Sequence, residues 1–139
     1  MTQPWFFKIY KGKSKDVLCE IIQKIDKEKY SAVKINKFID KVKSSDTIIS
    51  VCMTKDESNR VPEWEEIAAV SMAVQNMWLS CYVNDIGSYW STPALKDDYA
   101  KHSGLNSNQK SLGFFFMGSY KHLETPKVRE GLDSKVEWV

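Results

Sequence analysis

The chain has 139 residues, of which 42% are hydrophobic and 27% are charged, and its formal net charge is +2. This size and composition suit one folded domain and exclude a disordered chain. Residues 1–43 carry eleven lysines against five acidic residues, but five of the lysines are interleaved with Ile and Phe at helical spacing, namely Lys24, Lys27, Lys34, Lys37 and Lys41. We therefore interpret them as a solvated helix face rather than a nucleic-acid site.

The cysteines and histidines form no pattern typical of disulfides or metal sites. Cysteine occurs three times, each time in an apolar run far from the others, at Cys19, Cys52 and Cys81. Such residues are typical of buried, reduced thiols in a cytoplasmic protein. His102 and His122 have no Cys or His partner at ligand spacing, so we expect no metal. We also expect no signal peptide, because no basic leader precedes an apolar segment.

The first half of the chain alternates between strand and helix patterns. Trp5–Tyr10 is rich in aromatic and β-branched residues, which predicts a strand. Apolar residues at helical spacing predict one helix from Ser14 to about Ile25 and another over Ser31–Lys43. Asp46–Met53 is a nearly continuous apolar run and predicts an interior strand.

A long helix is expected from Pro62 to about Val83. Pro62 suits a first helical turn, and three glutamates follow it closely. Ile67–Asn84 has no formal charge, but its polar residues disfavour a membrane span. The middle of this helix is apolar nearly all round, so more than one surface must cover it. A partner subunit is a natural source of that cover.

The remaining elements are shorter. Asp85–Pro93 is expected to be a loop, and residues 94–103 a short helix. Ser111–Gly118 predicts a strand, and its two glycines indicate a bulge or a close approach by another segment. The polar tail ends in Val136–Val139, for which we expect a final edge strand.

The expected loop offers the first place for ligand chemistry. The sequence has no GxGxxG, P-loop or GxSxG motif, so an enzyme of this type would take its chemistry from a cofactor rather than from a catalytic residue. Gly87, Ser88, Tyr89 and Trp90 can bring backbone N–H groups and flat rings to a planar ligand. The alternative interpretation is a helix C-terminal turn anchored by two aromatic residues.

Two further segments could also contact a ligand. Lys127 and Arg129 lie on one side of an extended segment and suit a phosphate, or they belong to a solvated tail. Gln3 and Pro4 open the first strand, where the Gln3 amide can read the hydrogen-bonding edge of a heterocycle. None of these signals is specific by itself.

Six segments in a fixed order give the chain a family resemblance. They are TQPWFFKIYKG, PEWEEIAAVSMAVQNMWLSCYVNDIGSYWST, ALKDDYAKHSGL, KSLGFFFMGS, TPKVREGL and the terminal VEWV. Together they resemble the nitroreductase family of FMN-dependent oxidoreductases, nearest to its small nitroreductase-like subgroup. The resemblance implies an α+β fold with an antiparallel-rich sheet flanked by helices, in a single domain over residues 1–139.

The resemblance also implies an assembly and a reaction. Such proteins are intertwined homodimers whose long helix lies in the interface, with FMN between the subunits. Hydride passes from NAD(P)H to flavin N5 and then to a small-molecule acceptor, which is a nitro compound, a quinone or an enone. Carried over to this chain, Gly87, Ser88, Tyr89 and Trp90 lie beside the isoalloxazine, and Gln3 and Pro4 lie near the ring. By the same resemblance, Lys127 and Arg129 are expected to hold the phosphate.

The chain departs from the family at its start. The family has an Arg-Arg-Ser-x-Arg helix before the QPW segment, and this chain begins at Met1 just before Gln3. Each charge-assisted hydrogen bond lost with those arginines is worth about 1.5–3 kcal/mol. The alternative to an active enzyme is therefore a degenerate, non-catalytic dimer that binds flavin weakly or not at all. A misassigned or artificially shortened start is another explanation of the missing segment. A reading from a different class is a basic α+β module that binds an acidic partner.

Overall fold

The computed structural model describes residues 3–121 and 129–139. The described residues form a four-stranded antiparallel sheet in the order β1-β2-β4-β3, flanked by helices, and the predicted α+β class is confirmed. The strands are β1 (Trp5–Lys11), β2 (Thr47–Thr54), β3 (Gly87–Ser91) and β4 (Gln109–Gly118). The helices are α1 (Ser14–Gln23), α2 (Ala32–Ser44), α3 (Glu63–Val83), α4 (Lys96–His102) and a short 3-10 helix, Leu132–Ser134.

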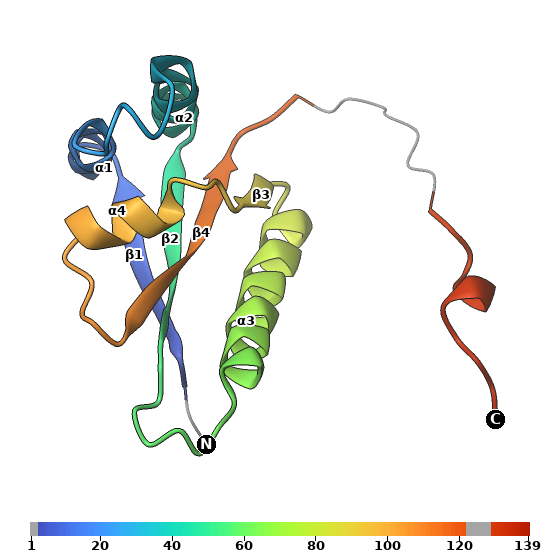
Figure 1. The fold of residues 1–139 in the computed structure, drawn as a ribbon. Helices are drawn as coiled ribbons and strands as arrows, with labels where there is room; N and C mark the ends of the chain where they lie inside the picture. Colours follow the sequence, from blue (N-terminus) through green and yellow to red (C-terminus); the bar gives the residue numbers. More distant parts are fainter. Residues whose placement is uncertain (1–2, 122–128) are drawn as a thin grey trace.

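The two faces of the sheet bury different sets of side chains. Successive residues of a strand point to opposite faces. Ile48, Phe114 and Phe116 therefore pack beneath α1, α2 and α4, whereas Ile49 and Phe115 face α3. Figure 1 shows α3 alone on its side of the sheet, with α1, α2 and α4 on the other.

One helix does not cover its whole face of the sheet. An α-helix is about 10 Å wide, and four strands span roughly 15–20 Å. Ile9, on the α3 side of β1, remains 63% exposed, and on α3 itself Met72 and Tyr82 remain 63% and 78% exposed. Large apolar side chains thus remain exposed both on α3 and on the α3 side of β1. Among the described residues, no helix has both the length and the apolar character needed to cross a bilayer.

The glycines of β4 produce the predicted irregularity. The pairing of β2 with β4 shifts between Val51 and Cys52, whose partners are Gly113 and Ser111. Gly113 has a φ of +118°, and a Cβ on it would lie 2.4 Å from the Ser91 carbonyl oxygen. Only glycine therefore lets the end of β3 approach β4 at this point.

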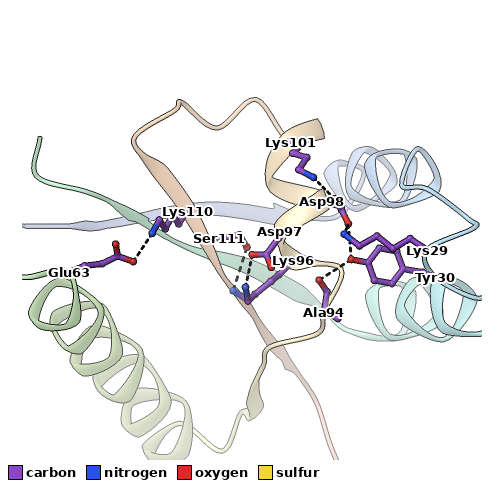
Figure 2. Close-up of polar contacts among 11 residues, drawn as sticks. Lys29, Tyr30, Glu63, Ala94, Lys96, Asp97, Asp98, Lys101, Lys110 and Ser111 are labelled. Atoms are coloured by element: carbon purple, nitrogen blue, oxygen red, sulfur yellow. Dashed lines mark hydrogen bonds and ion pairs between the residues drawn. The ribbon is translucent and has the colours of Figure 1, made fainter.

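An ionic cluster fixes α4 against the segment that precedes α2. Asp98 accepts hydrogen bonds from Lys101 Nζ at 2.7 Å, Lys29 Nζ at 2.5 Å and Tyr30 Oη at 2.7 Å. Figure 2 shows these side chains converging on the carboxylate. The hydrogen bonds from Lys101, Lys29 and Tyr30 hold the pKa of Asp98 well below its usual range.

A second ion pair joins the far end of β4 to α3. Lys110 Nζ lies 2.6 Å from Glu63 Oε1 in the first turn of α3 (Figure 2). All three cysteines are free and buried, as the sequence predicted.

Two expectations from the sequence are wrong. Gly87–Ser91 is not loop but strand β3, because its backbone pairs with β4 from Phe114 to Gly118. Val136–Val139 forms no strand, and Trp138 is 94% exposed. A strand needs a neighbouring backbone to pair with, and the described part of this chain offers the segment none.

Candidate functional site

A cleft of about 590 Å³ lies at one end of the sheet. Its walls come from the end of α2, the last two turns of α3, the start of β3 and the end of β4. It is lined by Ser44, Ser45, Trp78, Tyr82, Ile86, Gly87, Ser88, Tyr89, Phe116, Met117, Gly118, Ser119 and Tyr120. The volume falls within the range of about 300–1,000 Å³ that is usual for small-molecule sites.

Aromatic rings give the cleft a flat wall. Tyr89 stacks on Phe116 with ring centroids 5.1 Å apart and ring planes 13° apart. Phe116 is fully buried, so it fixes the position of the Tyr89 ring. Burial raises the pKa of Tyr89, so its hydroxyl stays protonated at neutral pH and is able to donate a hydrogen bond.

Gly87 allows a close contact at the mouth of the cleft. A Cβ on Gly87 would lie 2.8 Å from Tyr120 Cδ1. Tyr120 Oη in turn donates a hydrogen bond to Asp85 Oδ1 at 3.1 Å. The Tyr120 ring therefore packs on the backbone of Gly87, and any side chain at this position would displace it.

The described lining of the cleft offers hydroxyl groups to a ligand. Ser44 and Ser45 each donate to the carbonyl oxygen of Lys41, which closes the end of α2. The hydroxyls of Ser88 and Ser119 make no side-chain hydrogen bond to the described residues and remain available to a ligand. Among the described residues, no Asp, Glu, Lys, Arg or His side chain lines the cleft.

The structure brings together three of the predicted site residues. Gly87, Ser88 and Tyr89 line the cleft. Trp90 lies on the opposite face of the sheet and packs against the cluster beneath α3. The Trp90 Nε1 donor is buried there without a hydrogen-bond partner among the described residues.

Gln3 and Pro4 lie at the other end of the sheet. The Pro4 carbonyl oxygen accepts a hydrogen bond from the Thr54 N–H, and Thr54 pairs with Gln109 at the start of β4. Gly87, by contrast, pairs with the last residue of β4. The length of β4 separates the two groups, which is about 30 Å at 3.3 Å per residue. Within one chain they therefore form no common site.

Only one member of the basic pair of the C-terminal segment belongs to the described residues. Lys127 lies outside the described residues. Arg129 is described and exposed, and it does not line the cleft.

Sequence reasoning missed most of the other cleft residues. Trp78 and Tyr82 are spaced four residues apart on α3, and Gly118 and Ser119 end the FFFMGS segment. The aromatic i,i+4 pair is a usable signal because it marks one helix face. The serines at the end of α2 carry no such signal, since they reach the cleft only through the tertiary fold.

Comparisons with known proteins agree with this fold. The model of the Nitroreductase family matches residues 1–119. YdjA of Escherichia coli strain K12, which is named as a candidate NAD(P)H nitroreductase, is 24% identical over 123 residues. The match covers 84% of this chain and 66% of that protein, so this chain spans just under two thirds of the relative's length.

Solved structures share the same architecture. A nitroreductase-like family protein from Bacillus cereus superposes with a TM-score of 0.85 at 23% identity, covering 98% of this chain and 73% of that one. The FMN-dependent nitroreductase NfnB of Mycobacterium smegmatis, solved in complex with NADPH, gives a TM-score of 0.72 at 12% identity. That superposition covers 99% of this chain and 80% of NfnB. The family match over residues 1–119 and the shared fold together show that the chain belongs to the nitroreductase family.

Proposed function

We propose that two copies of this chain form an FMN-dependent oxidoreductase that uses NAD(P)H to reduce a nitro compound, a quinone or an enone. The observation that carries the proposal is the distance of about 30 Å along β4 between Gln3 with Pro4 and the Gly87–Tyr89 segment. Both groups match family segments expected at one flavin, and only a second copy can bring them together.

The uncovered apolar surface supports this assembly. The outer side of α3 and the α3 side of β1 expose large side chains, including Ile9, Met72 and Tyr82. A two-fold axis beside α3 would bury this surface against itself. It would also set the Gln3 end of one sheet near the Gly87 end of the other, so that the dimer has two equivalent sites.

The cleft fits the ring system of FMN. The Tyr89 ring, backed by the buried Phe116, offers a flat apolar wall, and Ser88 and Ser119 offer polar groups for a ring edge. Lys127 and Arg129 follow the end of β4 closely in the chain and are suited to the phosphate. When bound, FMN supplies the hydride chemistry, and this is consistent with a cleft in which none of the described lining residues is charged.

In this proposal the residues of the chain bind the flavin and orient its ring. The Gly87 backbone lets a ring approach without a side chain in the way, and the Ser88 hydroxyl orients the ring edge by hydrogen bonding. The aromatic wall excludes water from the face that it covers. The three buried, free cysteines favour a reducing compartment such as the cytoplasm.

A complementation experiment tests the shared site. Ser88→Trp fills the cleft, and Gln3→Glu places a charge at the opposite end of the sheet. Each variant alone is expected to lose FMN, measured by visible absorbance after gel filtration. The co-expressed mixture should recover FMN in about a quarter of its sites, because about half of its dimers are heterodimers and each heterodimer has one intact site of two.

The alternatives give different results. Mixed dimers that recover no FMN, although the unsubstituted dimer binds it, would show that the site is not shared between subunits. An unsubstituted protein that dimerises but acquires no flavin absorbance with excess FMN would be the degenerate, non-catalytic form. An unsubstituted protein that binds FMN and oxidises NADPH in the presence of a nitroaromatic acceptor would exclude that form.

A further inference from the structure

A second groove, of about 500 Å³, lies on the sheet face opposite α3. We call it the α2 groove. It runs between α2 and the segment that joins β3 to α4, and it is lined by Lys29, Tyr30, Lys34, Lys37, Phe38, Lys41, Ser91, Pro93, Ala94 and Leu95. Four of these residues are lysines, and no acidic residue of the described part of the chain lines the groove.

The positive charge of the α2 groove is mostly uncompensated. Lys29 pairs with Asp98, but Lys34, Lys37 and Lys41 form no ion pair with any described residue. Asp40 lies one turn from Lys37 on the same helix and does not pair with it either. The three free lysines follow one another at helical spacing and span about 10 Å of the helix axis.

The α2 groove adjoins the cleft. Lys41 Nζ lies 5.9 Å from the centroid of the Tyr89 ring. Lys41 lines the groove, whereas Tyr89 lines the cleft. These two side chains therefore stand at the boundary between the two sites, and one extended ligand is able to occupy both.

The floor of the α2 groove is apolar. Phe38 and Leu95 are buried beneath the lysines, and Tyr30 and Pro93 form part of the walls. An apolar floor under a row of cations suits a ligand that combines a flat base with phosphates. The volume of the groove falls within the range of small-molecule sites.

We propose that the α2 groove binds the phosphate-bearing adenosine half of the nicotinamide co-substrate, and that Lys34 and Lys37 contact the 2′-phosphate and so favour NADPH over NADH. This inference rests on the proposed function, because it assumes that the nicotinamide reaches the cleft. Lysine ammonium groups bind phosphate as point charges. NADH lacks the 2′-phosphate and would leave two of these charges without a partner.

Binding of adenosine 2′,5′-bisphosphate to the purified protein tests the groove without any catalytic step. Calorimetry should detect binding to the unsubstituted protein, and Lys34→Gln with Lys37→Gln should weaken it about tenfold or more. The matched control is Lys13→Gln with Lys24→Gln, which removes the same charge from exposed sites outside the groove and should leave the affinity unchanged. Adenosine 5′-monophosphate should bind more weakly than the bisphosphate.

Kinetics supply the second measurement. Lys34→Gln with Lys37→Gln should lower kcat/KM for NADPH about tenfold or more through a higher KM, with kcat/KM for NADH little changed. The proposal is overturned if the bisphosphate does not bind, if the groove variant binds it as tightly as the control, or if a single-stranded oligonucleotide binds the groove more tightly. If the protein binds FMN and oxidises NADH but fails these tests, the proposed function stands and the proposal for the α2 groove is refuted. If the protein binds no FMN but binds the bisphosphate through Lys34 and Lys37, the groove binds phosphate and the proposed function is refuted.

Discussion

Replacing Gly113 by alanine is expected to destabilise the fold strongly. Its φ of +118° lies in a region that residues with a Cβ rarely adopt, and such strain costs about 1–3 kcal/mol. The added Cβ would also lie 2.4 Å from the Ser91 carbonyl oxygen and 3.1 Å from Trp90 Nε1. Forcing extra atoms into a packed site costs about 1–3 kcal/mol more. We therefore expect a loss of roughly 4 kcal/mol.

For 139 residues, a loss of this size lowers Tm by roughly 10–15 °C. The assay is thermal unfolding by circular dichroism, with variant and parent at equal protein concentration. The matched control is Gly104→Ala, because Gly104 also has a positive φ, +69°, but has nothing within 4 Å of an added Cβ. The control should lose about 1 kcal/mol. If Gly113→Ala is no less stable than Gly104→Ala, the close approach of β3 to β4 is not what requires this glycine.

Three further predictions concern the described core and its polar groups. Phe114→Ala should cost about 3–5 kcal/mol in urea unfolding, because Phe114 is fully buried in the cluster beneath α1, α2 and α4; a loss below 1 kcal/mol would contradict that packing. Asp98→Asn should be less stable than the parent at neutral pH, and the difference should shrink as the pH falls below about 4, because the lowered pKa of Asp98 stabilises the fold only while the carboxylate is charged. A pH-independent difference would contradict this. Trp90→Phe should change the free energy of unfolding by less than about 1 kcal/mol, because the buried Nε1 donor has no partner among the described residues; a loss above 2 kcal/mol would indicate one.

Most helices and strands could be predicted from the sequence because their burial follows from local periodicity. The long helix, α3, lies within about a residue of its expected bounds, since its apolar run and its proline at the start are local signals. Strand β3 was missed because Gly87 and Ser88 are typical turn residues, and only pairing with β4 makes them a strand. Val136–Val139 gave the opposite error, since its strand-like residues have no partner strand in the described part of the chain.

The site was predictable only in part for the same reason. The Gly87–Tyr89 segment was identified from residue type and family order, and the structure places it in a cleft. That Trp90 points to the other face follows from strand alternation, which a loop assignment hides. The serines of the cleft and the lysines of the α2 groove needed the fold, because helical spacing alone does not distinguish a solvated face from the wall of a groove.

Because β4 separates Gln3 from Gly87, the flavin content of the proposed dimer depends on the protein concentration. In the proposed dimer each flavin is held by both subunits, so loss of the cofactor and dissociation of the subunits are linked equilibria. Diluting the protein would then release flavin even when the affinity of the assembled site is unchanged, and adding flavin would oppose dissociation. The flavin occupancy of a purified sample would depend on the subunit concentration as well as on the affinity of the assembled site for FMN.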